Sequence, residues 1–191
     1  IRKLKDEYGI KTGVWHPITG YWTGIDQEGP VAQKYSHLLD KTPSGRLIPP
    51  SDVPRGFMFW NAWHSLLKKQ GVEFVKVDNQ SFIRGFYRNK LPVCTIAKQM
   101  HEALEASTGL NFNNNMINCM GMASENVWHR PWSAISRSSN DFLPDDPKSF
   151  NDHALANAFN SYVYGPFIWC DWDMWWSNDS QGRKSSILRA V

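Results

Sequence analysis

The chain alternates short apolar runs with longer segments in which apolar residues recur every three or four positions. Short runs predict strands, at residues 11–16, 72–77, 116–120, 134–136 and 166–170. Helical spacing, or a glycine that ends a helix, predicts helices, at residues 1–8, 56–70, 92–109, 151–164 and 181–191. Strands therefore alternate with helices, which is typical of a parallel sheet in the α/β class.

One long stretch interrupts this alternation. Between residues 27 and 55 prolines and glycines are closely spaced, among them Gly29-Pro30 and Pro49-Pro50. Both residue types break regular structure, so the stretch predicts a long irregular loop. A loop of this length in a compact domain is usually functional.

Polar side chains gather where two of the predicted strands end. Lys76 and Asp78 lie at the end of the strand at 72–77. Arg137 follows the strand at 134–136, with Asp141 four residues later. Barrel enzymes keep their catalytic residues at the carboxyl ends of strands. The ordinary alternatives are a helix-capping or turn aspartate in the first group and a surface ion pair in the second.

The alternation fits two α/β architectures. An open doubly wound sheet normally has a Gly-rich phosphate-binding turn after its first strand, and none is present. A (β/α)8 TIM barrel usually needs about 250 residues, whereas this chain has 191. We therefore expect residues 1–191 to be a contiguous part of a catalytic (β/α)8 barrel. It would hold about five β/α units and be truncated at both ends, with a longer chain supplying the remainder.

Composition narrows the class of protein. With 41% hydrophobic residues, the chain can bury a sizeable core. The net charge of +3 is mild and the basic residues are scattered, so we expect no nucleic-acid partner. Aromatic residues make up 14%, and flat rings suit the apolar faces of sugars as well as a core. The best sugar-binding candidates are the tryptophans beside polar residues at strand ends, namely Trp15, Trp22, Trp172 and Trp175.

The three cysteines, Cys94, Cys119 and Cys170, are widely spaced. Their odd number and the lack of a Cys-x-x-Cys motif indicate neither a disulfide framework nor a zinc ribbon, and favour a reducing compartment such as the cytoplasm. No apolar run approaches membrane-spanning length, so no membrane partner is expected. A targeting segment ahead of Ile1 would place the protein outside the cytoplasm instead.

A metal site is another chemical alternative, because some of the histidines lie near carboxylates in the sequence. No histidine pair has ligand spacing on a helix with a supporting Glu. We therefore expect no metal and no other cofactor. His16 is interpreted as a sugar contact or as a residue that supports one.

Five segments, in this order, carry a resemblance to one family: VWHPITGYW, FVKVDNQ, ISRSSNDFLPDDP, HALANAFNSYVYG and WCDWDMWWS. The chain resembles the raffinose synthase and seed-imbibition-protein branch of glycoside hydrolase family 36, which includes alkaline α-galactosidases. The similarity spans nearly the whole chain, and its most specific parts are the KxD and RxxxD pair and the DWDM loop. It implies a (β/α)8 barrel that acts on α-galactosides with retention of configuration.

The resemblance also implies roles for individual residues. Asp78 of KxD would be the nucleophile, and Asp141 of RxxxD would be the general acid/base. Asn140 stands where the family more often has Asp, and the spacing from Arg137 favours Asp141 as the acid. The expected substrate-binding residues, some implied by the family and some inferred from their place in the chain, are Lys76, Arg137, Trp15, His16, Cys119, Asp171, Trp172 and Asp173. Helix capping is an equal alternative for the two aspartates that bracket Trp172.

Retaining chemistry needs two carboxylates for a plain reason. One attacks the anomeric carbon and the other protonates the leaving oxygen, with the pair roughly 5–5.5 Å apart. Lys76 beside Asp78 favours the charged form of the nucleophile, whereas the acid must hold its proton near neutrality. Two rival functions stay open: transfer of galactose to a sugar acceptor, and carbohydrate binding without catalysis.

Overall fold

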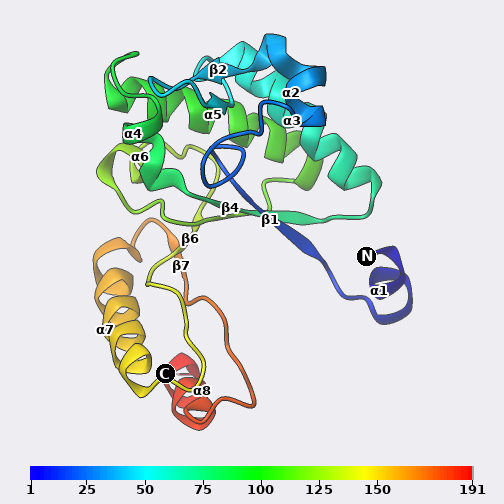
Figure 1. Ribbon diagram of the computed structural model, residues 1–191. Helices are drawn as coiled ribbons and strands as arrows, with labels where there is room; N and C mark the ends of the chain where they lie inside the picture. Colours follow the sequence, from blue (N-terminus) through cyan, green and yellow to red (C-terminus); the bar gives the residue numbers. More distant parts are fainter. Residues whose placement is uncertain (191) are drawn as a thin grey trace. The chain divides into compact units, whose positions relative to one another are not determined.

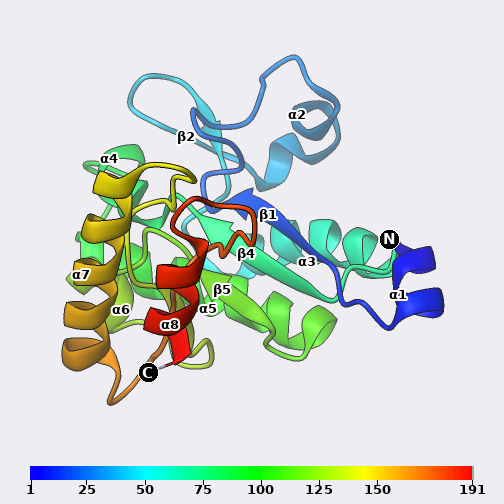
Figure 2. The ribbon, with the colours of Figure 1, turned by 90° about the horizontal axis from the view of Figure 1, so that it is seen from below.

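The computed structural model describes residues 1–190 and divides into two compact units, Ile1–Ser133 and Ala134–Val191. In the first unit three strands pair in parallel, β1 (Gly13–Pro17), β4 (Phe74–Asp78) and β5 (Met116–Asn118), with β4 in the middle (Figures 1 and 2). Trp15 lies opposite Lys76, and Pro17 lies opposite Asp78. The parallel pairing confirms the predicted α/β class for this part of the chain.

Two long helices cover one face of these strands, α3 (Val53–Lys69) and α5 (Val93–Phe112), and they pack against each other (Figures 1 and 2). Asp52 caps α3 because its carboxylate accepts the backbone N–H of Arg55 at 3.0 Å, a contact typically worth about 1 kcal/mol. The unit also contains shorter helices, α1 (Arg2–Tyr8), α4 (Ile83–Phe86) and α6 (Ser124–Val127), and a 3₁₀ turn, η2 (Gln80–Phe82). No helix within residues 1–190 is both long and apolar enough to cross a membrane.

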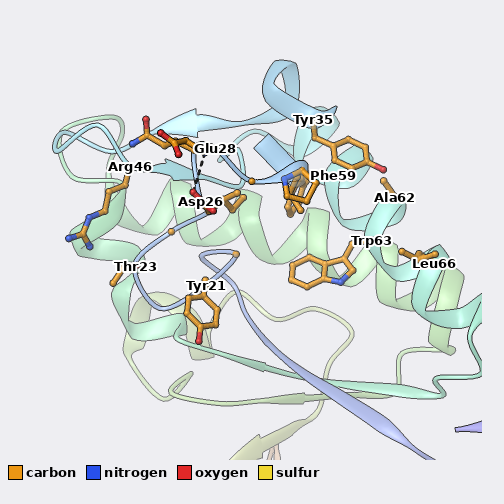
Figure 3. Close-up of a pocket in the computed structure, with 17 residues that line it drawn as sticks. Tyr21, Thr23, Asp26, Glu28, Tyr35, Arg46, Phe59, Ala62, Trp63 and Leu66 are labelled. Atoms are coloured by element: carbon orange, nitrogen blue, oxygen red, sulfur yellow. Dashed lines mark hydrogen bonds between the residues drawn. The ribbon is translucent and has the colours of Figure 1, made fainter. Parts of the chain in front are cut away.

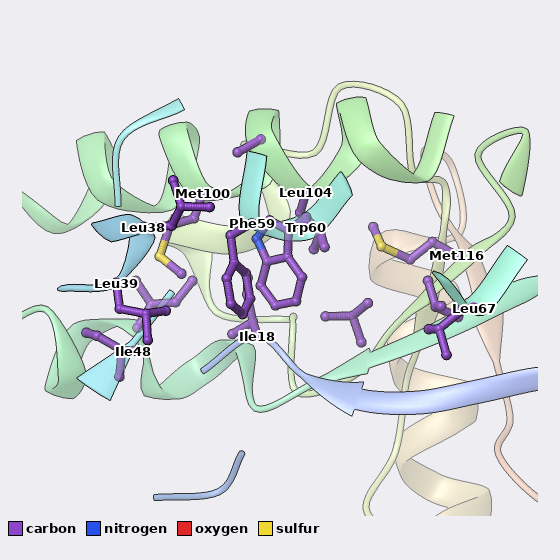
Figure 4. Close-up of a cluster of buried hydrophobic side chains, with 14 of the residues drawn as sticks. Ile18, Leu38, Leu39, Ile48, Phe59, Trp60, Leu67, Met100, Leu104 and Met116 are labelled. Carbon is purple, nitrogen blue, oxygen red and sulfur yellow. The ribbon is translucent and has the colours of Figure 1, made fainter. Parts of the chain in front are cut away.

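The core of the first unit is a single cluster of apolar side chains contributed by the strands and the helices (Figure 4). Val75 and Val77 of β4 have no exposed surface, and Trp60 of α3 and Leu104 of α5 are also buried. Burial of apolar surface stabilises the fold by about 25 cal/mol for each Å². Because side chains alternate along a strand, the valines of β4 at the core place its polar side chains on the opposite face.

The stretch from 27 to 55 was predicted to be irregular, and this prediction was wrong in part. It contains a short helix, α2 (Pro30–Tyr35), a 3₁₀ turn, η1 (Ser36–Leu38), and an antiparallel hairpin of β2 (Asp40–Lys41) and β3 (Leu47–Ile48). These elements are too short to leave a periodic pattern in the sequence. Local hydrogen bonds across the turn, such as the Thr42 N–H to the Arg46 carbonyl at 2.8 Å, and contacts that are distant in sequence both hold them.

Asp40 makes the main polar contacts of this hairpin. Its carboxylate lies 2.9 Å from Arg55 Nη2 and 2.9 Å from Lys90 Nζ, and it accepts the backbone N–H of Ser51 at 3.2 Å. Partial burial alone would raise the pKa of Asp40, but hydrogen bonds from Lys90, Ser51 and Arg55 bring this pKa below its usual value. The hairpin is therefore anchored to α3 and to the segment after α4.

The second unit has a parallel pair of strands, β6 (Ile135–Arg137) and β7 (Trp169–Asp171), in which Arg137 lies opposite Asp171. Helix α7 (Pro147–Tyr164) packs against β7, and α8 (Gly182–Ala190) follows near the end of the chain. A buried strand was predicted at 166–170. The strand instead begins at Trp169, which is 76% exposed. The apolar composition of the segment therefore predicted a strand correctly but wrongly predicted that the strand is buried.

Helix α7 buries its polar side. His153 and Asn157 are its buried residues, whereas Leu155, Phe159 and Tyr162 are exposed. The aligned apolar residues correctly predicted a helix here. The helix begins at Pro147 rather than at 151, because Asp146 accepts the backbone N–H groups of Lys148 and Ser149 and so caps it.

Candidate active site

Asp78 is the last residue of β4 and is largely buried. Its Oδ2 atom accepts the indole N–H of Trp15 at 2.9 Å, and its Oδ1 atom accepts the backbone N–H of Asn79 at 2.6 Å. One donor comes from the neighbouring strand and the other from the next residue in the chain. Hydrogen bonds to both oxygens restrict rotation of the carboxylate and give it a defined direction.

Three of the predicted site residues, Trp15, Lys76 and Asp78, share one face of the sheet in the first unit. Alternation along the strands and the register of Trp15 with Lys76 bring them together. The ring of Trp22 lies 5.4 Å from that of Trp15, measured between centroids, and both side chains are partly exposed. Aromatic rings beside a few polar and charged groups are the lining that small-molecule sites commonly have.

His16 is not part of this group, which corrects the expectation of a direct sugar contact. It neighbours Trp15 on β1, so alternation turns its ring to the helix side, where the ring packs against Trp60 and Trp63 of α3 and is 2% exposed. His16 Nε2 lies 3.1 Å from Nε2 of His64, whose Nδ1 lies 2.8 Å from Oγ of Ser107. His16 is therefore a residue of the core.

Burial controls the charge of this histidine pair. Desolvation lowers the pKa of His16 to about 4, although a hydrogen bond to the Pro17 carbonyl raises it slightly. Desolvation, together with the neighbouring His16, lowers the pKa of His64 to about 2. Both rings are consequently neutral at physiological pH.

Cys119, another predicted sugar contact, follows β5 directly. Its backbone N–H donates to the carbonyl of Val77 at 2.8 Å, which places it beside the end of β4. The residue has no exposed surface, and its thiol is not in a disulfide. Its position next to the strand that carries Asp78 agrees with a role at the site, whereas its burial leaves it no surface of its own for a ligand.

The second unit contains the RxxxD pair. Arg137 ends β6, its Nη1 donates to Oδ1 of Asp141, and it also lies 3.9 Å from Oδ2 of Asp173. The Asp173 carboxylate accepts the backbone N–H of Phe142 at 2.8 Å. Arg137 is nearly buried, whereas the side chain of Asp141 is 74% exposed. Asp173 therefore supports the loop that carries Asp141, and it does not cap a helix.

Asp171 and Trp172 lie at the carboxyl end of β7. The indole N–H of Trp172 lies 3.4 Å from Ser161 Oγ on α7, and the guanidinium of Arg189 lies 6.0 Å from the centre of its ring. Arg189 also donates to the backbone carbonyls of Trp172 and Met174, at 2.9 and 2.6 Å. Burial lowers the pKa of Arg189, and the neighbouring Asp171 and Asp173 act in the opposite direction.

Several residues that organise this loop were not predicted from the sequence. Asp145 and Asp179 connect the segment before α7 to the segment before α8. Asp179 accepts the backbone N–H of Asp145 at 2.7 Å, and Asp145 accepts the backbone N–H of Ser180 at 2.7 Å. The partners are more than 30 positions apart in the sequence, so no local motif reveals them.

Asn140 is exposed, and its carbonyl accepts the hydroxyl of Ser139 at 2.9 Å.

A separate cavity of about 1090 Å³ opens between the segment 20–31 and one side of α3 (Figure 3). Tyr21, Tyr35 and Trp63 contribute aromatic surface, and Asp26 and Arg46 contribute charge. None of the predicted site residues lines it. Within residues 1–190, no group of three or more His, Cys, Asp or Glu side chains is placed to hold a metal ion.

The amino-acid sequence of this chain is similar to those of several plant proteins. The chain is 34% identical to probable galactinol–sucrose galactosyltransferase 1 of Arabidopsis thaliana and 27% identical to stachyose synthase of Pisum sativum. The alignments cover 100% and 99% of this chain but 28% and 27% of those proteins. The chain therefore spans little more than a quarter of the length of these relatives.

A solved structure is also similar. The chain matches the α-galactosidase TtGalA from Thermus thermophilus, in complex with stachyose, with a TM-score of 0.61 over 97% of this chain and 44% of that one. At 13% sequence identity this similarity shows a shared fold alone. Residues 44–191 match the family described as raffinose synthase or seed imbibition protein Sip1. Because this match covers most of the chain, the chain belongs to the raffinose synthase and seed imbibition protein family.

Proposed function

We propose that the protein containing this chain is an α-galactoside-processing enzyme that works through a covalent galactosyl-enzyme intermediate, with Asp78 as nucleophile and Asp141 as general acid/base. The observation that carries the proposal is the Asp78 carboxylate, held by Trp15 and the Asn79 amide on the face that also carries Lys76. Family membership supports galactoside chemistry.

The reaction has two steps. First, an oxygen of Asp78 bonds to the anomeric carbon as the glycosidic bond breaks, and Asp141 gives its proton to the leaving oxygen. Next, Asp141 takes a proton from an incoming hydroxyl as that oxygen attacks the anomeric carbon and releases Asp78. Two inversions at one carbon give net retention.

The strands of the two units are proposed to belong to one catalytic (β/α)8 barrel. Parallel pairing in each unit and the fold shared with TtGalA support this arrangement. On this basis Lys76, Trp15 and Arg137 are the proposed sugar contacts, with Trp172 and Asp171 at the neighbouring strand end. Asp173 and Cys119 are assigned to the support of these groups, because the side chain of Asp173 is only 5% exposed and Cys119 is buried.

The acceptor in the second step decides between hydrolysis and transfer. Water gives hydrolysis, whereas a sugar hydroxyl gives a new oligosaccharide. The relatives named galactinol–sucrose galactosyltransferase and stachyose synthase favour transfer as the second candidate function. Incubation of the full-length protein with an aryl α-galactoside or galactinol, with and without sucrose, separates the two by the product formed.

The nucleophile is tested by Asp78→Gly in the full-length enzyme. Turnover should be lost, and added azide should restore cleavage of an aryl α-galactoside, because the small anion enters the space left by the carboxylate. The product should then be the β-galactosyl azide. Asp78→Asn is the matched control, since its amide fills that space and should prevent rescue.

Two results would contradict the proposal. Turnover by Asp78→Gly at the wild-type rate would remove Asp78 from the chemistry. Sugar binding by the wild-type protein without any turnover would favour the non-catalytic alternative.

A further inference from the structure

The residue after Asp78 has an unusual backbone conformation. Asn79 has φ 65° and ψ 19°, in the left-handed region, and it joins the end of β4 to the turn η2. Side chains with a Cβ disfavour this region, although Asn tolerates it better than most. The Asn79 N–H, which donates to Oδ1 of Asp78 at 2.6 Å, lies in the planar peptide group between the two residues. Because β4 and η2 fix the chain on either side, a change in φ of Asn79 requires a compensating rotation of this peptide plane, which turns the N–H away from Oδ1.

The side chain of Asn79 is held by Thr19 on the loop after β1. Asn79 Nδ2 lies 2.7 Å from Thr19 Oγ1, and Thr19 Oγ1 lies 2.6 Å from the carbonyl oxygen of Tyr21. A hydroxyl has one hydrogen, and the carbonyl can only accept it, so Thr19 must accept from the Asn79 amide. This order fixes the orientation of the amide group as well as that of the hydroxyl.

Both residues are closed to solvent. Thr19 and Asn79 have no exposed surface, so water cannot readily replace either partner if the other is removed. The backbone reinforces the contact, because the N–H of Ile18 donates to the carbonyl of Asp78 at 2.8 Å. The loop after β1 is thus hydrogen-bonded to β4 at Asp78, the residue that carries the carboxylate.

We propose that Thr19 and Asn79 are positioning residues for the Asp78 carboxylate. Thr19 holds Asn79 in its left-handed conformation, and this fixes the peptide plane between Asp78 and Asn79, so that the Asn79 N–H stays on Oδ1 of Asp78. The inference rests on the proposed function, in which Asp78 is the nucleophile. Trp15 donates to the other oxygen, Oδ2. Thr19 and Asn79 together therefore complete the set of contacts that fixes the direction in which the Asp78 carboxylate attacks.

The first test compares two replacements of Asn79 in the full-length enzyme. Glycine adopts the left-handed conformation freely, whereas alanine resists it. Asn79→Ala should therefore lose kcat by about 10- to 100-fold, the range that a small misplacement of a reacting group produces, and Asn79→Gly should lose clearly less. KM should change little in both. If side-chain packing alone mattered, glycine would be equal to alanine or worse, and that ranking would overturn the proposal.

The second test removes the hydroxyl of Thr19. Thr19→Val should lower kcat in the same range, and Thr19→Ser should restore most of it. Thr108→Val is the matched control, because Thr108 is equally buried and donates its hydroxyl to the carbonyl of Glu105 on α5. Circular dichroism and the thermal midpoint show whether the Thr19 and Thr108 variants are folded to the same extent.

The third test asks whether Thr19 acts through the carboxylate. In the azide-rescued Asp78→Gly enzyme no carboxylate remains to be positioned, so adding Thr19→Val should have little further effect. An equal loss in both backgrounds would give Thr19 a general structural role and overturn the inference. Failure of the proposed function gives a different result, an Asp78→Gly enzyme that keeps its activity or is not rescued by azide.

Discussion

At the scale of single residues, the two proposed catalytic carboxylates have opposite surroundings. Asp78 is buried and bonded through both oxygens, whereas Asp141 is exposed within its unit and contacts Arg137 through one oxygen. A nucleophile benefits from a fixed direction, and an acid/base must exchange its proton with each turnover. The two environments suit these different tasks.

Replacement of the acid should depend on the leaving group. Asp141→Ala should slow cleavage of natural oligosaccharides far more than cleavage of activated aryl galactosides, because only the former need protonation of the leaving oxygen. General acid catalysis typically contributes about 10²- to 10⁴-fold. Asn140→Ala is the neighbouring control and should be mild. The reverse ranking of the two variants, measured by kcat/KM on both substrates, would move the acid role to another group.

The buried histidines predict how stability depends on pH. His16 and His64 have pKa values lowered to about 4 and about 2, so between pH 6.5 and 4 the unfolded chain binds protons that the folded chain does not. The free energy of unfolding should therefore fall on acidification, by up to about 1.4 kcal/mol per pH unit for each such histidine. Above pH 6.5 their contribution is constant.

Urea denaturation of the full-length protein at several pH values tests this slope. His64→Gln should be less stable at pH 7 and should lose stability less steeply between pH 6.5 and 4. The exposed His37 provides the control, because His37→Gln should leave the slope unchanged. A wild-type slope in His64→Gln would show that the buried pair does not govern acid sensitivity.

The site residues on β1 and β4 illustrate what sequence can predict at this scale. Lys76 and Asp78 are two positions apart on a strand, so alternation alone places them on one face. The same rule separates His16 from Trp15, and that signal was present in the sequence but was outweighed by the polar character of histidine. The role of Thr19 could not be predicted, because its partner lies 60 positions away.

At the scale of elements, helix α7 depends on its cap. Asp146→Ala removes the acceptor for two backbone N–H groups and should destabilise the first turn by about 1 kcal/mol. Asp146→Asn should be nearly neutral, because Asn is an equally good cap. Hydrogen exchange of the α7 amides measures the difference, and equal exchange rates in both variants would mean that the cap is unimportant.

Long elements were predicted more reliably than short ones. Helices α3 and α5 repeat their apolar positions over several turns, and that repetition identifies them directly. The hairpin of β2 and β3 has two residues in each strand and depends on Asp40, whose partners Arg55 and Lys90 lie outside it. The turn between the strands has local hydrogen bonds of its own, such as the Gly45 N–H to the Thr42 carbonyl at 2.9 Å. Two residues in each strand are nevertheless too few for a periodic pattern that would identify the strands.

At the scale of the whole molecule, the exposed apolar side of α7 predicts the behaviour of the chain on its own. Leu155, Phe159 and Tyr162 present apolar surface on one helix, and surface of this kind drives association. We expect the 191-residue chain, expressed alone, to self-associate or to be insoluble. Sedimentation velocity of the wild type and of Phe159→Ser with Tyr162→Ser tests this, and the double variant should shift the distribution toward monomer. A wild-type monomer would contradict the expectation.

The hydrophobic pattern of these 191 residues predicts how neighbouring strands pair, but it does not predict how the strands of the complete protein close into a barrel. Alternating strands and helices correctly predicted parallel pairing, because right-handed β/α connections leave few other arrangements. Closure of a barrel depends on the number and stagger of all its strands, and the relatives are more than three times as long as this chain.

The buried pair on β1 and α3 also has a spectroscopic consequence. The Pro17 carbonyl, 3.4 Å from His16 Nδ1, can only accept, so His16 carries its hydrogen on Nδ1 and accepts at Nε2. His64 must then donate from Nε2 and receive the hydroxyl hydrogen of Ser107 at Nδ1. The two rings are thus opposite tautomers. In ¹⁵N spectra of the side chains, Nδ1 of His16 and Nε2 of His64 should appear protonated, whereas Nε2 of His16 and Nδ1 of His64 should appear unprotonated.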